Sequence, residues 1–240
     1  MSSHLLLIVI SISEEVCLFD GTVLLANFFD QAFLMQLLEY KNMSASNLCR
    51  PLDPMRLQAP VFAKSYPADD YSLMIRPFCV GTDMDLLCGW LELQTGISFR
   101  KEEGPRPELQ QSCVDVLKSN HSQSLMCLLD DRPVCQADIN KPPYNEVFMY
   151  LDSNAGDYAL GLIMSPYATV RNAYVSIVRV YLEYLFSFEE VGRVITYLPV
   201  YDEWSNHLLK NAGFRYVDTK KILSGVINLY ECRRNNSNQM

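Results

Sequence analysis

Few side chains in this 240-residue sequence have the type and spacing that chemistry requires. Asp138 and Asn140 are two positions apart in a segment with strand character, so their side chains are expected on the same face of that strand. A carboxylate is a potential general base, and an amide can orient a substrate by hydrogen bonding. For each residue a structural role stays open as the alternative: Asp138 could be a solvated or turn-supporting carboxylate, and Asn140 could start the loop that follows.

The other reactive side chains favour structural roles. Asp130 and Asp131 are neighbours whose side chains point apart, which indicates a turn. His121 lies in a polar turn, and His207 lies near the end of a predicted helix, where a histidine caps the helix or faces solvent. The eight cysteines form no CxxC pair and have no nearby histidine. We therefore expect no metal site, and we expect small buried thiols in a reducing, cytoplasmic protein.

Composition narrows the class of partner. Apolar residues make up 49% of the chain, enough for a sizeable core, and the formal net charge is −8. This balance repels phosphate backbones, so nucleic acid is an unexpected partner, although a compact basic patch for one small anion is compatible with it. Leu5 to Ile10 is the one apolar run at the start, too short to span a bilayer and without a basic flank. It reads as a strand, and no membrane association is expected.

The first part of the chain reads as an extension. Residues 22–41 have apolar positions at helical spacing, and the stretch from Ser44 to Pro67 is rich in proline and polar residues, as connectors are. We therefore divide the chain into an N-terminal extension, residues 1–66, and a main domain, residues 67–240. The extension could dock on the main sheet, cover a substrate, or mediate formation of a homodimer.

From Tyr71 the pattern alternates between strands and helices. Asp83 is the expected N-cap of the first of these helices, and Asp202 and Gly213 are expected to bound the last one. Strands are predicted over residues 71–78, 124–129, 132–139, 158–166, 192–199, 214–218 and 225–231, and helices over residues 83–93, 107–119, 172–186 and 202–212. This order predicts a layered α/β fold built on one sheet rather than a helical bundle.

Four segments carry a resemblance to a known family. They are Arg132 to Asn140, Asp157 with 159–163, 192–199, and the run 208–213 that ends in Ala-Gly before Phe214. Together with the order of elements, they resemble the GNAT acyltransferase superfamily, over about residues 70 to 232. The nearest likeness is to the branch that acylates amines and hydroxylamines in hydroxamate siderophore biosynthesis.

The resemblance implies a fold and a co-substrate. The fold is a mixed central sheet flanked by helices, in which the strand before the central helix splays from its neighbour. Its free backbone groups pair with the pantetheine arm of acetyl-coenzyme A or another acyl-coenzyme A, and the following helix start receives the pyrophosphate. The residues implied in this binding are Leu162, Ile163, Met164, Val170, Arg171, Asn172, Ala173, Tyr174 and Val175.

The chain departs from the family pattern at several positions. The phosphate loop has Ala173 and either Tyr174 or Val175 where the family has glycines. Gly161 replaces the branch's histidine, and Tyr197 replaces its aspartate. A phenol near the leaving sulfur can act as a general acid, and the alternative is an aromatic side chain of the core or rim.

The function implied by the resemblance is N-acyl transfer, with acetyl as the expected acyl group, to a small amine or hydroxylamine. Asp138 takes the place of the branch's glutamate and would be the base; Asn140 and Tyr197 are the other candidate catalytic residues. Two rival interpretations remain open: a degenerate GNAT fold that binds a ligand or partner without catalysis, and a GNAT enzyme that acylates a protein lysine or an amino acid.

Overall fold

The computed structural model describes residues 18–19, 22–23, 48–95, 106–167, 173–222 and 225–234. The strand predicted over residues 5–10 lies outside this range, as does most of the helix predicted over residues 22–41. The first two residues of that predicted helix, Thr22–Val23, form a short strand, β2, which pairs with β1, Leu18–Phe19.

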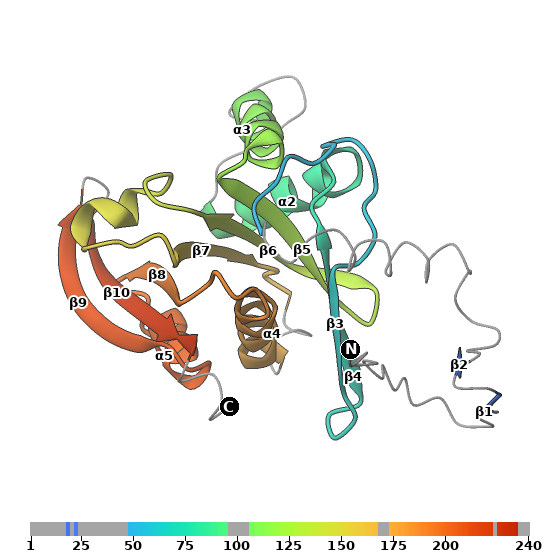
Figure 1. Ribbon diagram of the computed structural model, residues 1–240. Helices are drawn as coiled ribbons and strands as arrows, with labels where there is room; N and C mark the ends of the chain where they lie inside the picture. The colour runs from blue at the N-terminus through green and yellow to red at the C-terminus, as the bar shows by residue number, and fades with distance from the viewer. Residues whose placement is uncertain are drawn as a thin grey trace.

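The main body is built on one eight-stranded sheet (Figure 1). Its strand order is β3-β4-β5-β6-β7-β8-β10-β9, and every neighbouring pair is antiparallel except β7 and β8, which are parallel. The strands are β3 (Phe62–Tyr66), β4 (Tyr71–Pro77), β5 (Ser122–Leu129), β6 (Arg132–Asn140), β7 (Asp157–Met164), β8 (Arg193–Pro199), β9 (Arg215–Ile222) and β10 (Gly225–Arg233).

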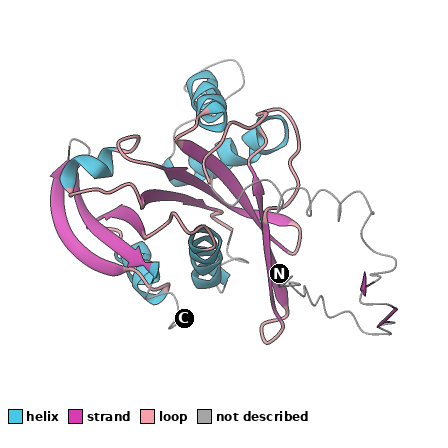
Figure 2. Ribbon diagram, viewed as in Figure 1, coloured by secondary structure: helices cyan, strands magenta, loops and turns pink. Residues whose placement is uncertain are grey.

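Helices cover both faces of the sheet (Figures 1 and 2). One face carries α2 (Val80–Thr95), α3 (Arg106–Lys118) and the short 3-10 helix η1 (Glu146–Tyr150). The opposite face carries α4 (Tyr174–Phe186) and α5 (Glu203–Asn211). The predicted layered α/β fold and the order of its elements from Tyr71 onward are confirmed.

The core lies on both sides of the central strands. β5 is buried along almost its whole length because α3 covers one of its faces while the α4 layer covers the other. On β6, Cys135, Ala137 and Ile139 belong to the apolar cluster around α4. Side chains alternate along a strand, so Gln136 and Asp138 face the α2, α3 and η1 side. In α4, apolar residues at helical spacing form one stripe, and these members of it are buried: Ile177, Val178, Tyr181, Tyr184 and Leu185.

Two predictions about local structure are wrong. The segment read as a connector contains β3, whose residues 62–66 pair with β4. The helix expected to start at Asp83 begins at Val80, so Asp83 is not its N-cap. Its carboxylate instead accepts a hydrogen bond from the Cys79 backbone N–H at 2.9 Å and pairs with Arg76 at 2.7 Å. An acidic side chain is favoured throughout the first turn of a helix, so its presence did not locate the first residue.

The predicted turns are confirmed. Asp130 and Asp131 have φ of 44° and 64°, the left-handed backbone of the two-residue turns that suit the twist of a hairpin. Asp202 caps α5, because its carboxylate accepts from the Ser205 N–H at 3.1 Å. Gly213 follows the helix with φ of 107°, a conformation that glycine adopts without strain.

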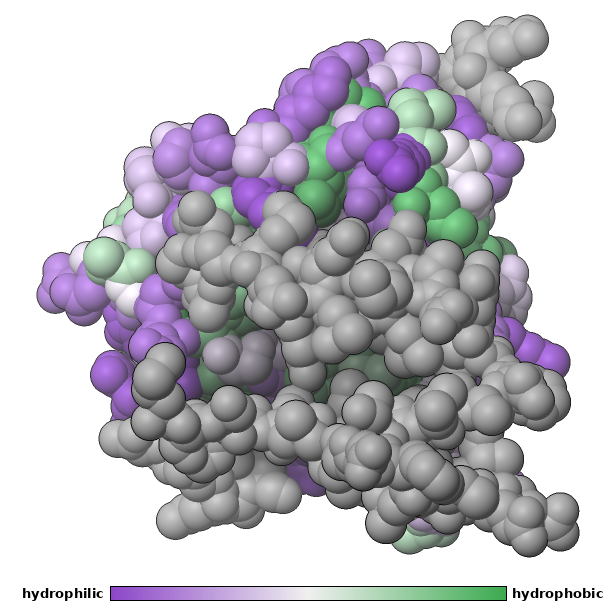
Figure 3. Space-filling model, turned by 45° about the vertical axis from the view of Figure 1, so that its right-hand side comes forward, coloured by the Kyte–Doolittle hydropathy of each residue, from purple (hydrophilic) through white to green (hydrophobic). Residues whose placement is uncertain are grey.

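The distribution of polar side chains on the surface is consistent with helices that cover the sheet. α3 exposes most of its side chains, and the upper part of the molecule shows mainly hydrophilic residues with hydrophobic ones between them (Figure 3). Among the described residues, no helix has both the length and the apolar character needed to cross a membrane.

Candidate active site

The sheet opens between its two parallel strands. β7 pairs with β6 over six positions, Leu160 and its neighbours included, but with β8 over three only, from Asp157 to Ala159. Beyond Ala159 the two strands diverge (Figure 1). In the described part of the chain, the β8-facing edge of residues 160–164 therefore has backbone groups without a strand partner. Such an edge can take an extended ligand as an added strand does.

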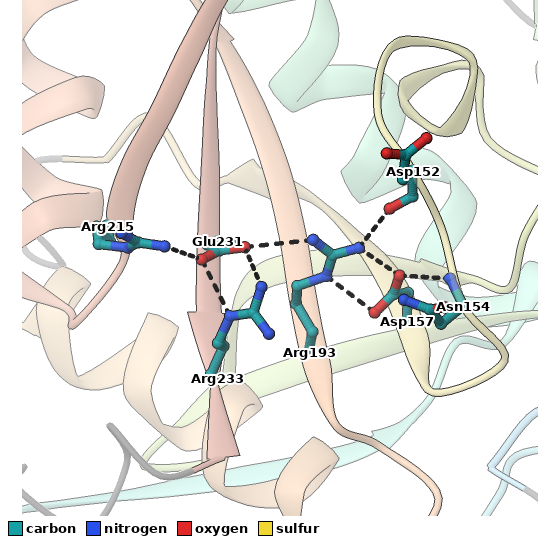
Figure 4. Close-up of polar contacts among 7 residues, drawn as sticks. All are labelled: Asp152, Asn154, Asp157, Arg193, Arg215, Glu231 and Arg233. Carbon is teal, nitrogen blue, oxygen red and sulfur yellow. Dashed lines mark hydrogen bonds and ion pairs between the residues drawn. The ribbon is translucent and has the colours of Figure 1, made fainter.

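An ion network holds the closed end of this opening (Figure 4). The Arg193 guanidinium on β8 donates to Asp157 on β7, with Nε 2.9 Å from Oδ1, and approaches Glu231 on β10, with Nη1 3.3 Å from Oε2. It also donates to the Asp152 carbonyl oxygen at 2.8 Å. The three strands are thus joined by side chains at the point from which β7 and β8 diverge.

Glu231 is the centre of charge in this network. Burial opposes its ionisation, but hydrogen bonds from Arg233, Arg215 and Arg193 outweigh burial and lower its pKa from 4.5 to about 2. Glu231 is therefore ionised at neutral pH, and its charge is compensated by the guanidinium groups around it.

Beside the opening, one part of the sheet face is exposed. Gly161 on β7 is exposed, and a Cβ added there would meet only the Asp138 carbonyl oxygen, at 3.9 Å. Asp138 is its register partner on β6. Tyr197 lies two residues beyond Ile195, the last β8 residue paired with β7, and so points to the same face. A carboxylate and a phenol therefore lie on either side of an exposed glycine.

The Asp138 carboxylate is held by a polar chain. Gln136 donates through Nε2 to Asp138 Oδ1 at 2.6 Å and to Ser124 Oγ at 2.7 Å. Burial raises the pKa of Asp138 above its ordinary value of 3.8, and hydrogen bonds from Ser124 and Gln136 oppose that rise. A carboxylate with a raised pKa is a stronger base than an ordinary aspartate.

Tyr197 has a partner that the sequence pattern did not indicate. Its hydroxyl donates to Glu146 Oε1 at 2.9 Å, and burial together with this carboxylate raises the pKa of Tyr197 to about 12. Glu146 is exposed at the start of η1, which is anchored by the buried Val147 and Phe148. The phenol is therefore protonated at neutral pH, as a proton donor must be.

The third candidate catalytic residue has a structural contact. Asn140 is the last residue of β6, and its Oδ1 accepts from the Ser122 hydroxyl at 2.7 Å. This bond ties the ends of β5 and β6 together, in line with the loop-starting alternative. A substrate-orienting role for Asn140 stays a prediction.

The candidate cofactor-binding residues divide into three groups. Leu162, Ile163 and Met164 are half-buried along the edge of β7 that has no strand partner, and the Met164 carbonyl oxygen accepts a hydrogen bond from Gln94 Nε2 at 2.6 Å. Residues 170–172 lie outside the described residues, so the predictions for Val170, Arg171 and Asn172 do too. At the start of α4, the Ala173 and Tyr174 side chains are buried and Val175 is half-buried.

The start of α4 is fixed by Tyr174, whose hydroxyl donates to the Ser165 carbonyl oxygen at 2.6 Å. The N-cap residue, Ala173, offers no side chain to the first-turn N–H groups. These N–H groups are thus the only part of residues 173–174 that can meet an anion.

Two surface cavities lie at opposite ends of β7. One, of about 540 Å³, includes Lys141, Tyr158 and Glu190 in its lining, and the other, of about 530 Å³, includes Arg132, Ser165 and Tyr167. Neither is lined by Asp138 or Tyr197. Within the described ranges, no group of three or more histidine, cysteine, aspartate or glutamate side chains is placed to hold a metal ion.

Comparison with protein families decides the identity of the fold. The family model described as acetyltransferase (GNAT) domain matches residues 80–222, more than half of the chain. The chain belongs to the GNAT acetyltransferase family. The matched range of this GNAT domain runs from α2 to the end of β9, so it contains both sides of the opening. Among curated proteins, no relative matches the sequence.

Solved structures of low sequence identity share the fold of this GNAT domain. An uncharacterised protein from Bacillus halodurans matches with a TM-score of 0.64 at 16% identity, over 77% of this chain and 95% of that one. Aminoglycoside acetyltransferase AAC(6')-Ib, in complex with coenzyme A and kanamycin, matches at 0.60 and 14%, over 70% and 98%. A chimera of spermidine N-acetyltransferase SpeG from Vibrio cholerae and hSSAT matches at 0.54 and 13%, over 70% and 99%.

Sequence reasoning missed two polar groups beside the opening. Gln136 is two residues before Asp138, so strand alternation alone could have placed it on the same face. Glu146 gave no such signal, because it comes from a separate short helix after a loop that contains a cis Pro142–Pro143 bond.

Proposed function

We propose that this GNAT protein is an N-acyltransferase that transfers an acetyl group from acetyl-coenzyme A to a small amine or hydroxylamine. The observation that carries the proposal is the parting of β7 and β8 beyond Ala159, next to the exposed Gly161 with Asp138 and Tyr197 on the same face. The similar folds of an aminoglycoside acetyltransferase in complex with coenzyme A and kanamycin, and of a spermidine N-acetyltransferase chimera, support it.

The thioester arm would lie along the unpaired edge of β7. Backbone groups of Leu162, Ile163 and Met164 would pair with its amides, and the first N–H groups of α4, at Ala173 to Val175, would face the pyrophosphate. Because backbone groups supply these contacts, the buried side chains of Ala173 and Tyr174 are compatible with binding. Residues 170–172 stay predicted members of the same loop.

The acceptor would react by direct attack within a ternary complex. Asp138 would take the proton from the amine as its nitrogen attacks the thioester carbonyl carbon, and the carbon–sulfur bond then breaks. The raised pKa of Asp138 suits this role. The absence of a side chain at Gly161 leaves room for the reacting atoms beside the carboxylate.

Tyr197 would return a proton to the departing thiolate. Its phenol is protonated at neutral pH; because its single hydrogen is donated to Glu146 in the structure, the hydroxyl would turn from Glu146 toward the sulfur to deliver that proton. A hydroxylamine acceptor, and with it a role in siderophore biosynthesis, rests on the sequence resemblance. A cytoplasmic location rests instead on the scattered cysteines, and a main domain that begins at residue 67 rests on composition, although β3, which precedes that residue, pairs with β4.

Turnover is the test of this proposal. Purified protein is incubated with acetyl-coenzyme A and a panel of small primary amines and hydroxylamines, and acetylated product is measured by mass spectrometry. We expect product with at least one acceptor class, formed in proportion to enzyme. Binding of acetyl-coenzyme A without product from any acceptor would instead support the non-catalytic alternative, which the changed positions Gly161 and Tyr197 favour.

A further inference from the structure

Several charges on the face of the sheet that carries α2, α3 and η1 form ion pairs, but two carboxylates near the opening do not. Ion pairs join Arg76 to Asp83, Arg106 to Asp85 and Arg193 to Asp157. Among the described residues, Asp138 and Glu146 form no ion pair. The site therefore combines two carboxylates with no described cation to neutralise either.

Glu146 is held in place by its surroundings rather than free to swing. Asn145 caps η1 through its side chain, which accepts from the Val147 N–H at 3.0 Å. Val147 and Phe148 anchor the helix in a cluster that includes Ala159 of β7 and Ile195 of β8. Tyr197 then occupies only one of the two carboxylate oxygens, Oε1. The other oxygen has no described donor and is available to an ammonium group.

Arg193, the cation on the same face of β8, does not neutralise the charge of Glu146. Arg193 is four residues before Tyr197, and its guanidinium is already engaged by Asp157, Glu231 and a backbone carbonyl (Figure 4). A positively charged acceptor would thus meet attraction at Glu146 and no free described cation beside it.

We propose that Glu146 determines acceptor specificity by binding a second cationic group of the acceptor, so that the preferred substrates are small diamines. This inference rests on the proposed function. One nitrogen, deprotonated by Asp138, would be acetylated, while an ammonium at the other end is held by Glu146. Glu146 does not touch the reacting atoms, but it also holds the Tyr197 hydroxyl, so its effect on acceptor binding is read from the difference between diamines and monoamines.

The test compares Glu146→Gln with the unaltered protein on length-matched pairs of acceptors. The pairs are 1,3-diaminopropane with propylamine, 1,4-diaminobutane with butylamine, and 1,5-diaminopentane with pentylamine. We expect the unaltered protein to prefer the diamine of at least one pair. In Glu146→Gln the KM for that diamine should rise about tenfold relative to the KM for its matched monoamine, since a hydrogen bond to a charged group is lost, while a change in kcat that acts through Tyr197 should be the same for both acceptors.

The matched control is Glu189→Gln, which removes the same charge from an exposed position after α4 and should leave all constants unchanged. An equal effect of Glu146→Gln on monoamines and diamines, or no effect, would overturn the inference while leaving the transferase in place.

A second readout does not require turnover. The preferred diamine is titrated calorimetrically into each protein saturated with coenzyme A. Binding that weakens about tenfold in Glu146→Gln, with no acetylation of the same diamine in a separate reaction that contains acetyl-coenzyme A, would uphold Glu146 and reject the proposed transferase. Absence of both binding and acetylation of diamines would reject the inference, and product formed from monoamines alone would leave the transferase standing.

Discussion

At the scale of single residues, the candidate site and the ion network beside it contain two carboxylates, Asp138 and Glu231, whose surroundings differ. Asp138 and Glu231 are both surrounded by protein, but one faces neutral hydrogen-bond partners and the other faces three guanidinium groups. Burial therefore raises the pKa of Asp138, whereas arginine contacts lower that of Glu231. A carboxylate is thus proposed as the base at Asp138, while the carboxylate of Glu231 is an anion that joins strands.

Replacement of Asp138 by asparagine is expected to lower kcat by about 10² to 10³, the usual contribution of a general base. Affinity for acetyl-coenzyme A, measured by titration, should stay unchanged.

In the unaltered enzyme the rate should fall with decreasing pH through a pKa above 3.8, because only the ionised carboxylate accepts a proton. That limb should be missing from the Asp138→Asn profile. Asp131→Asn is the control, since asparagine tolerates its left-handed turn conformation; a normal rate in Asp138→Asn removes this residue from the mechanism.

Glu231 gives a prediction about stability. Its pKa is lowered from 4.5 to about 2 on folding, so its contribution is present above pH 4.5 and is lost as the pH falls through 2. The shift corresponds to about 3 kcal/mol at neutral pH. Glu231→Gln should reduce the free energy of unfolding by up to that amount in urea titrations. The loss of stability between pH 4.5 and 2 should also be smaller in the variant. Exposed Glu189→Gln serves as reference, and equal curves for both variants would contradict the account.

At the scale of elements, the opening is a consequence of strand pairing. β7 pairs with β6 along most of its length, but it pairs with β8 only at its first three residues. There the ion pair between Arg193 and Asp157 also joins β7 and β8. Gly161 lies just past this junction. The opening therefore joins an unpaired backbone edge to an exposed patch of the sheet face.

Gly161→Val tests that arrangement. The added side chain meets open space, so the free energy of unfolding should change by less than about 1 kcal/mol. It would nevertheless fill the place proposed for the reacting atoms, and kcat/KM should fall about 10²-fold. Gly89→Val, the same change in open space on α2, is the control. Full activity in Gly161→Val would move the reaction away from this face.

The elements also show what a sequence can predict. Alternation along β6 and the apolar stripe of α4 came from local periodicity, and the structure agrees with both. The start of α2 was misplaced because Asp83 bonds back to Cys79 from inside the helix. The Tyr197–Glu146 bond joins residues 51 positions apart, and no local pattern encodes such a contact. The position of Asp138 beside Gly161 likewise depends on the register between two strands.

At the scale of the whole molecule, the fold and the family agree on a GNAT domain. Its eight-stranded sheet is covered by α2, α3 and η1 on one face and by α4 and α5 on the other. The described cysteines are free and buried, and burial raises the pKa of thiols such as Cys49 and Cys113 to about 12. These thiols are thus poor nucleophiles, consistent with direct transfer rather than a covalent acyl-enzyme.

Calorimetric titration of the purified protein with acetyl-coenzyme A tests the central claim most directly. The account predicts saturable binding with one site per chain and a Kd in the micromolar range, about −8 kcal/mol. If acetyl phosphate, a small acetyl donor, gives no such heat, the coenzyme A part of the donor rather than its acetyl group is recognised. Absence of binding at millimolar acetyl-coenzyme A would contradict the account, because the unpaired edge of β7 would then not be a thioester site.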